Sequence, residues 1–297
     1  NTGARTLSSA GTIGVAGAFT PGNNSYTVAG STINFNSTEI QTIPAFNYHH
    51  LTRSNNGITF LATSGIIGIA GTFTPGGSGY DLTGSTIEFN GSGTQTIPLF
   101  NYNNLSSSNT GARILQSGII SIGIAGAFSP GSNTYTITGN TIEFNGSGSQ
   151  TIPAFNYNNL TSSNTGARTL ASSGTIGIAG AFTTGTNSYT VTGNTIDYNG
   201  SSSQTISAFN YNNLTSSSTG ARILASSGTI GIAGAFTPGA NSYTVTGSTV
   251  SFNGTGAQNI SGITYNNLSI DGSGIKNATG NITVTGILTL NNDMDMA

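Results

Sequence analysis

The stretch Gln150-Thr-Ile-Pro-Ala-Phe155-Asn-Tyr-Asn-Asn-Leu160 decides the fold, because the Phe-Asn-Tyr at its centre returns along the whole chain. It recurs at 46–48, 100–102 and 209–211, and a degenerate copy, Ile-Thr-Tyr, stands at 263–265. The tyrosines are therefore 54 or 55 residues apart, and the one extra residue lies between Gly118 and Gly123. A fixed interval of this size is the signature of supersecondary units stacked into an array.

This interval divides the chain into segments of one continuous solenoid. We expect a partial repeat at 1–47, repeats at 48–101, 102–156, 157–210 and 211–264, and a degenerate partial repeat at 265–297. Both ends look like cuts through the interior of a longer array, because neither carries the atypical repeat that caps such arrays.

Each repeat divides further into about three coils. Residues 157–210 split into 157–174, 175–194 and 195–210, and every part holds two apolar segments separated by Gly, Asn or Ser. The spacing predicts two stacked rows of core residues. The first row is Leu160, Ile178, Ile196 and Leu214, and the second row is Leu170, Val191, Ile206 and Leu224.

The apolar segments have the pattern of β-strands. Tyr-Thr-Val-Thr and Thr-Ile-Glu-Phe-Asn alternate with period two and are rich in β-branched residues, while Gly-Asn, Asn-Gly and Pro-Gly pairs mark corners. The predicted fold is all-β, an elongated parallel β-helix (β-solenoid) nearly free of helix. An antiparallel sandwich would not explain one register kept over five units, and disorder would not explain the regularly spaced apolar residues.

The composition excludes several classes of function. Charged residues make up only 5% of the chain, the net charge is −2, and there is no cysteine. A protein with six basic residues cannot neutralise a run of phosphates, so no nucleic-acid partner is expected. No apolar run approaches the roughly 20 residues of a membrane helix, so no membrane insertion is expected.

The titratable residues do not form a recognisable active site, and we expect no enzyme, no cofactor and no metal. Glu88, Glu143 and Asp197 share one repeat position, where they would be outward strand residues, whereas a catalytic pair needs two different environments at one place. His49 and His50 are adjacent, so their side chains would point to opposite faces of a strand.

The arginines are the candidates for specific lateral contacts. Arg5, Arg113, Arg168 and Arg222 recur in Thr-Gly-Ala-Arg, and one repeat lacks this motif and carries Arg53 instead. A periodic, exposed arginine could bind a partner's carboxylates or carbonyls. It could equally be a solvated residue that discourages edge pairing.

The repeats resemble a known family. Gln150 to Leu160, Tyr-Thr-Val-Thr-Gly at 189–193, and the degenerate end from Tyr265 to Gly286 are similar to the β-strand-repeat regions of giant surface adhesins and filament proteins of the Bacteroidota. The resemblance covers the whole chain in style of repeat and not in one diagnostic motif. It implies β-helices that extend an adhesive or gliding filament, often exported by the type IX secretion route.

We therefore expect an extracellular or cell-surface structural segment, a fibre body or an adhesin stalk. The expected partners are copies of itself, packed side by side, and after these cell-surface glycans. The alternative function is a glycan- or ice-binding solenoid that uses repeated Thr, Asn and aromatic faces. A polysaccharide-processing β-helix would need a unique cluster of acids or bases, and the sequence contains none.

Overall fold

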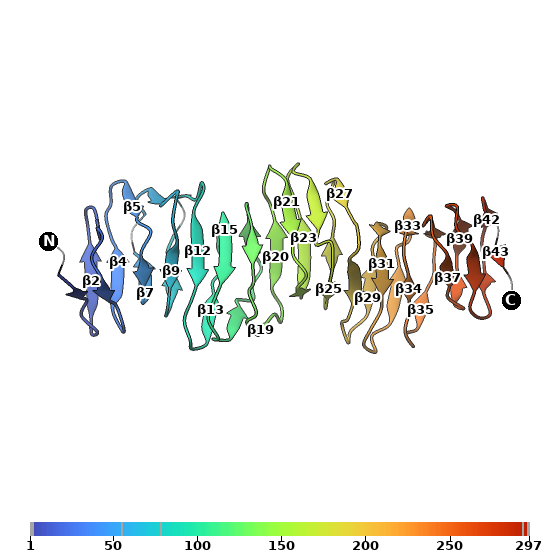
Figure 1. The fold of residues 1–297 in the computed structure, drawn as a ribbon, viewed down its shortest axis with the longest axis horizontal. Coiled ribbons are helices and arrows are strands. Elements are labelled where there is room, and N and C mark those ends of the chain that lie inside the picture. The colour runs from blue at the N-terminus through green and yellow to red at the C-terminus, as the bar shows by residue number, and fades with distance from the viewer. Residues whose placement is uncertain (1–2, 55, 78, 293, 296–297) are drawn as a thin grey trace. The chain divides into compact units, whose positions relative to one another are not determined.

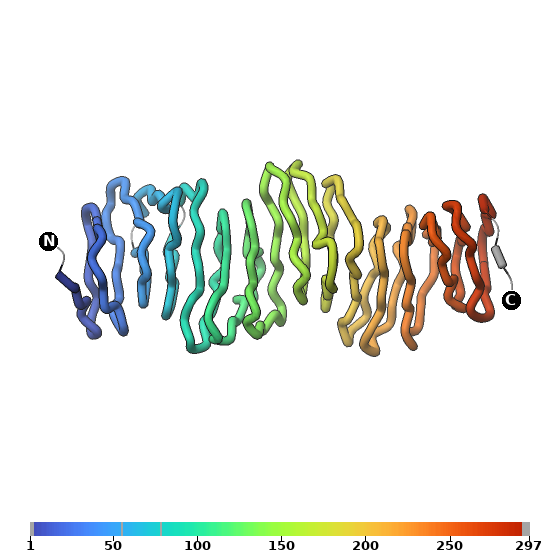
Figure 2. Tube along the Cα trace, viewed as in Figure 1, coloured from blue at the N-terminus to red at the C-terminus, as the bar shows by residue number. Residues whose placement is uncertain are grey.

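A computed structural model describes residues 3–54, 56–77, 79–292 and 294–295. The chain forms two compact units, unit 1 at residues 1–150 and unit 2 at residues 151–297. The described residues contain strands and no helix, and therefore no helix that could cross a membrane. Within each unit the coils follow one another as a parallel β-solenoid, which confirms the predicted fold class (Figures 1 and 2).

Every coil contributes strands to two rows. In the first row, the strands Thr86–Phe89, Asn159–Ser162 and Thr195–Tyr198 read Thr-Ile-acid-aromatic or Asn-Leu-Thr-Ser and bury alternate side chains. In unit 1 the first row consists of β2 (Thr12–Val15), β4 (Thr32–Phe35), β6 (Asn47–Tyr48), β7 (His50–Arg53), β9 (Ile67–Ile69), β10 (Phe73–Thr74), β12 (Thr86–Phe89), β14 (Asn101–Tyr102), β15 (Asn104–Ser107), β17 (Ile122–Ile124), β18 (Phe128–Ser129) and β20 (Thr141–Phe144). In unit 2 it consists of β22 (Asn156–Tyr157), β23 (Asn159–Ser162), β25 (Thr175–Ile178), β26 (Phe182–Thr183), β28 (Thr195–Tyr198), β30 (Asn210–Tyr211), β31 (Asn213–Thr215), β33 (Thr229–Ile232), β34 (Phe236–Thr237), β36 (Thr249–Phe252), β38 (Thr264–Tyr265), β39 (Asn267–Ile270), β41 (Thr283–Val284) and β42 (Leu288–Leu290).

Second-row strands are two or three residues long, and those at Gln95–Ile97, Arg113–Leu115 and Arg222–Leu224 bury their first and third residues. They are β1 (Arg5–Thr6), β3 (Tyr26–Thr27), β5 (Gln41–Ile43), β8 (Thr59–Leu61), β11 (Tyr80–Asp81), β13 (Gln95–Ile97), β16 (Arg113–Leu115), β19 (Tyr135–Thr136), β21 (Gln150–Ile152), β24 (Arg168–Leu170), β27 (Tyr189–Thr190), β29 (Gln204–Ile206), β32 (Arg222–Leu224), β35 (Tyr243–Thr244), β37 (Gln258–Ile260), β40 (Lys276–Ala278) and β43 (Met294–Asp295).

The register confirms two of the three predicted steps of the second row, but not the step from Val191 to Ile206, because β27 and β29 belong to different sheets. Ile206 pairs with Leu224 as predicted, and the Thr169–Thr190 pair brings Leu170 beside Val191.

In the first row Ile196 pairs with Leu214, as the spacing of 18 predicts. The other two predicted steps are wrong, because Ile178 pairs with Tyr157 and Tyr198, and Leu160 pairs with Phe182. The reason lies at Asn-Tyr-Asn-Asn, where the chain makes two short strands, β22 and β23, that pair with β25 and β26 of the next coil. A single list of apolar spacings cannot represent a row that splits in this way.

The Phe-Asn-Tyr anchor has a structural role in each repeat. The Tyr157 ring is fully buried, and its hydroxyl donates to the Pro153 carbonyl at 3.1 Å. Phe155 is half-buried and meets the Tyr157 ring edge-on, with centroids 4.9 Å apart. Asn156 faces outward, where its Oδ1 accepts a hydrogen bond from Asn199 at 3.3 Å.

The Asn–Asn bridge explains a glycine in the strand between its two partners. A Cβ on Gly177 would lie 1.9 Å from Asn156 Oδ1 and 2.6 Å from Asn199 Nδ2. Glycine is therefore required by the close approach of side chains from the coils on either side. The same arrangement recurs in unit 1, where Asn90 reaches Asn47 at 3.3 Å.

Candidate functional site

The recurring arginines do not lie on the surface. Arg113, Arg168 and Arg222 are 0% exposed and are among the largest fully buried side chains of the protein. Arg5 is half-buried and donates to the Gly3 carbonyl at 3.0 Å. The expectation of a solvated arginine row is therefore wrong for Arg113, Arg168 and Arg222, whose guanidinium groups cannot reach a lateral partner in this structure.

Each buried guanidinium lies in a cage of backbone carbonyl oxygens. Arg222 Nη2 donates to Tyr198 at 2.6 Å and to Ser217 at 2.7 Å, and its Nη1 donates to Gly220 at 2.6 Å. Longer bonds reach Ala221 and Gly200, both at 3.3 Å. The carbonyl dipoles replace the water that the cation loses on burial, and the cation satisfies carbonyls that leave the sheet at a corner.

Unit 1 contains the same cage. Arg113 Nη2 donates to Ser108 at 2.6 Å and to Phe89 at 2.8 Å, and its Nη1 donates to Gly111 at 2.8 Å. These carbonyls belong to the coil of the arginine and to the coil before it, so one guanidinium joins two coils.

A left-handed turn belongs to each cage. Asn109, Asn164 and Ser218 occupy one repeat position and have φ of 57°, 56° and 64°. Each directly follows the serine whose carbonyl accepts a hydrogen bond from the arginine. These serines are Ser108, Ser163 and Ser217. Asparagine tolerates this conformation better than most residues.

The repeat without Thr-Gly-Ala-Arg still has a caged guanidinium. Thr59 occupies the arginine position, and Arg53, which stands where later repeats have Ser107 and Ser216, is only 3% exposed. Arg53 donates to the Gly77 carbonyl at 2.9 Å and also to the Gly57 carbonyl, and it lies over the Tyr80 ring at 4.6 Å. The cation has moved from one strand row to the other while its role at the corner is kept.

The last repeat uses lysine in the same place. Lys276 pairs with Gln258 in register as Arg222 pairs with Gln204. Its ammonium group donates to Gly254, Gly256 and Gly274 at 2.9, 3.2 and 3.0 Å.

Nearly all the positive charge of the protein is therefore internal. Of six lysines and arginines, the five with exposures of 3% or less are Arg53, Arg113, Arg168, Arg222 and Lys276. Desolvation lowers the pKa of Arg113, Arg168 and Arg222, and the neighbouring tyrosine in each case raises it. An arginine stays charged despite such a shift, so the cations act in the interior and are not free to bind phosphate or an acidic partner.

The sequence does contain a signal for this burial. In Ala-Arg-Thr-Leu the arginine stands two residues before Leu170, and residues two apart on a strand face the same way. The structure follows that rule, since Arg168 and Leu170 are buried and Thr169 is exposed. The charge of Arg168 led to the expectation of a surface position, whereas strand alternation with Leu170 would have placed it inside.

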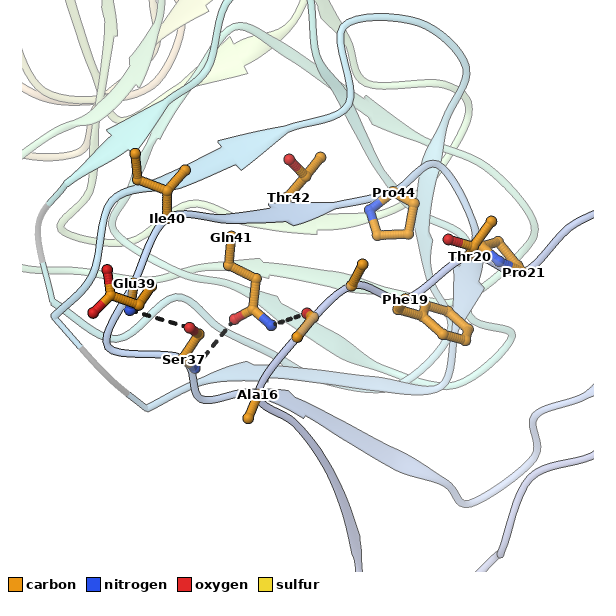
Figure 3. A pocket seen from close by; sticks show the side chains of 12 residues that line it. Ala16, Phe19, Thr20, Pro21, Ser37, Glu39, Ile40, Gln41, Thr42 and Pro44 are labelled. Carbon is orange, nitrogen blue, oxygen red and sulfur yellow. Dashed lines mark hydrogen bonds between the residues drawn. The ribbon is translucent and has the colours of Figure 1, made fainter.

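A buried glutamine holds the backbone at the corner of the coil before the arginine. Gln204 Oε1 accepts from the Gly200 amide at 2.8 Å, and its Nε2 donates to the Ile178 and Gly180 carbonyls, both at 2.8 Å. Gln41 makes the corresponding bonds in the first repeat, where its Oε1 accepts from the Ser37 amide and its Nε2 donates to two carbonyls of the coil before. Figure 3 shows that its amide forms part of a groove lined by residues 16–21 and by Ser37, Glu39, Ile40, Thr42 and Pro44. The Gln41 amide and the Ser37 hydroxyl of this groove are already bonded to the backbone.

A second kind of groove recurs at the aromatic residues. In unit 2 it is lined by Asn187, Tyr189, Val191, Phe209 and Asn210, together with Thr184. The corresponding residues of unit 1, Asn24, Tyr26, Val28, Phe46 and Asn47, line an equivalent groove. Phe209 meets Tyr189 edge-on at 4.9 Å, so each groove combines an aromatic pair with amide groups.

The acidic residues lie where the strand pattern predicts. Glu88, Glu143 and Asp197 are half-buried, and each stands between two buried residues of its strand. Asp197 accepts hydrogen bonds from the Ser217 amide at 2.9 Å and the Ser217 hydroxyl at 2.6 Å. These carboxylates are spread over successive repeats, and Glu143 and Asp197 accept hydrogen bonds from serines of neighbouring coils.

The histidines lie beside each other on β7 and the residue before it. Their ring centroids are 4.3 Å apart, so the expectation that the two side chains point to opposite faces is wrong, because the strand begins only at His50. His50 Nδ1 lies 2.8 Å from the Thr72 hydroxyl. Desolvation and the neighbouring His49 lower the pKa of His50. Among the described residues no three His, Cys, Asp or Glu side chains form a group that could hold a metal ion.

Comparison with known protein families, with curated proteins and with solved structures finds no match to this chain.

Proposed function

We propose that this chain is a structural repeat segment of an extracellular bacterial fibre or adhesin stalk. The observation that supports this proposal most is that buried polar side chains bond to the backbone of the solenoid itself. The buried Gln204, Arg222 and Asn194, and their counterparts in other repeats, lie inside the solenoid, and both Gln204 and Arg222 bond to backbone groups. A chain that commits its strongest donors to its own corners is suited to stiffness and regular extension.

The proposal predicts that repeats are interchangeable. Deleting residues 157–210 joins Asn156 to Tyr211 and recreates an intact Phe-Asn-Tyr-Asn-Asn-Leu anchor. The shortened protein should fold, should keep its assembly behaviour, and should be shorter by three coils, or about 14 Å at about 4.8 Å per coil. Electron microscopy and scattering would measure this length. Loss of a specific catalytic or binding activity on deletion of this single repeat would contradict a spacer role.

Self-association remains part of the proposal, but its chemistry changes. With weak charge repulsion between chains, we expect copies to pack side by side. Replacing Arg113, Arg168 and Arg222 by Ser should destabilise the coils themselves, because these side chains are buried, so this variant does not test lateral contact. Light scattering over a wide concentration range tests it directly, and a strict monomer would argue against it.

Glycan binding is the second candidate, and the recurring aromatic groove favours it. Aromatic faces and amides are suited to the apolar faces and hydroxyls of sugars. A glycan array probed with the intact chain should give hits that weaken when Phe46 and Phe209 are both changed to Ala. Matched changes of Ile119 and Ile275 to Ala serve as the control, because both side chains are exposed and neither lines one of the aromatic grooves. An array without hits would exclude this function for the sugars tested.

A further inference from the structure

Four Asn-Gly pairs occupy one repeat position, directly after a first-row strand. They are Asn90-Gly91, Asn145-Gly146, Asn199-Gly200 and Asn253-Gly254. A fifth pair, Asn56-Gly57, lies elsewhere in its repeat, in the loop before β8.

Asn-Gly is chemically labile, because glycine has no Cβ to hinder an approach to its amide nitrogen. That nitrogen attacks the asparagine Cγ, the bond from Cγ to the side-chain nitrogen breaks, and ammonia leaves. The resulting succinimide is opened by water to aspartate or isoaspartate. Water is the only other reactant, and the step requires a free glycine amide and a rotated asparagine side chain.

In the four equivalent pairs the glycine amide is engaged by a buried glutamine. It donates to the Oε1 of Gln95, Gln150 or Gln204 at 2.8 Å, and of Gln258 at 2.9 Å. These glutamines are at most 5% exposed, and each is fixed by two further bonds from its Nε2 to carbonyls of an earlier coil.

The asparagine side chain is also restrained in three of these pairs. Asn90, Asn145 and Asn199 each donate to an outward asparagine of an earlier coil at 3.3 Å. Both partners of the reaction are thus held apart by hydrogen bonds, and reaction requires a local opening of the corner.

The fifth pair has a different environment. Asn56 is exposed, and Gln41, which lies on the strand that pairs with β8, accepts from the Ser37 amide and not from Gly57. The Gly57 carbonyl accepts a bond from Arg53, so a change in the backbone at this point reaches the caged guanidinium.

We propose that Gln95, Gln150, Gln204 and Gln258 protect the four repeat Asn-Gly pairs from deamidation, and that Asn56 is the site where this protein is modified spontaneously. This resistance to deamidation does not depend on the proposed structural role of the chain, and the two proposals are tested by different measurements.

The test is incubation of the intact protein at mildly alkaline pH, followed by proteolysis and mass spectrometry with isoaspartate detection at each Asn-Gly pair. In the folded protein Asn56 should deamidate at least about tenfold faster than Asn90, Asn145, Asn199 and Asn253, because the rate at a protected pair is reduced by the small population of its open state. In denaturant all five rates should converge. Equal rates at Asn56 and Asn199 in the folded protein would overturn the proposal.

A variant tests the glutamine directly. Gln204→Leu keeps a side chain of similar size and removes the acceptor for Gly200. Deamidation should rise at Asn199 alone, while Asn90 and Asn253 in the same molecule stay slow and report that the fold persists. Gln258→Leu is the matched variant and should raise the rate at Asn253 alone. If Asn199 stays slow in Gln204→Leu while Asn90 also stays slow, glutamine is not the protecting group.

Discussion

The caged guanidinium can be moved from one strand row to the other, and this makes its energetic role testable. The repeat with Arg53 and Thr59 provides a natural template. The corresponding positions in unit 2 are Ser216 and Arg222. We predict that Arg222→Thr and Ser216→Arg each destabilise the protein, and that the double variant Ser216→Arg/Arg222→Thr recovers much of the loss.

The magnitude follows from the bonds of the cage. Arg222→Thr removes three short bonds to the Tyr198, Ser217 and Gly220 carbonyls, at 2.6, 2.7 and 2.6 Å. Hydrogen bonds to a charged donor contribute about 1.5–3 kcal/mol each, so the gross loss is about 4.5–9 kcal/mol. The guanidinium also no longer needs to be desolvated, which offsets part of this loss. We expect a net loss of about 3 kcal/mol in the free energy of unfolding.

Ser216→Arg alone should also destabilise, because it forces a second cation into an occupied cage and removes the hydroxyl that accepts from Tyr243 at 2.9 Å. In the double variant the new arginine can reach the vacated carbonyls and lie over the Tyr243 ring, as Arg53 does with Tyr80. The coupling energy between the two positions should then be about 2 kcal/mol or more in favour of the double variant.

Urea unfolding followed by circular dichroism would give the four free energies, and amide hydrogen exchange at β32 and β35 would localise the effect. Local measurement is needed because repeat arrays open repeat by repeat. A loss below about 1 kcal/mol for Arg222→Thr, or strict additivity of the two changes, would refute the view that the cage needs one cation.

Three further outcomes follow from the structure. Gly177→Ala should cost about 2 kcal/mol or more in unfolding free energy, because its Cβ would displace the Asn–Asn bridge, whereas Gly148→Ala, with nothing within 4 Å of its Cβ, should be neutral in the same urea titration. Tyr198→Phe should lower the free energy of unfolding by about 1–2 kcal/mol, because the Tyr198 hydroxyl accepts from the Ser207 amide at 3.3 Å and bonds to the Tyr211 hydroxyl at 2.9 Å. Adding Ser207→Pro should reduce that loss, because proline, which three other repeats have at this position, removes the amide donor. If the double variant is no more stable than Tyr198→Phe, this explanation is wrong. Burial raises the pKa of many tyrosines, so the folded state keeps protons that the unfolded chain releases; stability should be unaffected below about pH 10 and fall as the pH rises above it. Tyrosinate absorbance and circular dichroism should therefore change together in an alkaline titration, and tyrosine ionisation well before unfolding would contradict the burial of Tyr48, Tyr80, Tyr102, Tyr135, Tyr157, Tyr189, Tyr198, Tyr211, Tyr243 and Tyr265.

The sequence by itself determined the class of fold and the division into coils. The Phe-Asn-Tyr interval and the alternation in Thr-Ile-acid-aromatic specify parallel strands in two rows, since stacking is the arrangement that buries the same residues at the same register in each repeat. In the second row, the pairing of Ile206 with Leu224 was predicted to the residue.

The tertiary structure alone decided what the polar residues do. The first row divides at Asn158, so that β22 and β23 pair with different strands of one neighbouring coil, and a linear spacing does not contain that information. The arginines are buried because corner carbonyls from two coils converge on one point, and only three-dimensional stacking brings Tyr198, Ser217 and Arg222 together. Composition alone suggests that the few charged side chains face water. The cage of backbone carbonyls replaces the hydration that each guanidinium loses, and this allows the charge to be buried.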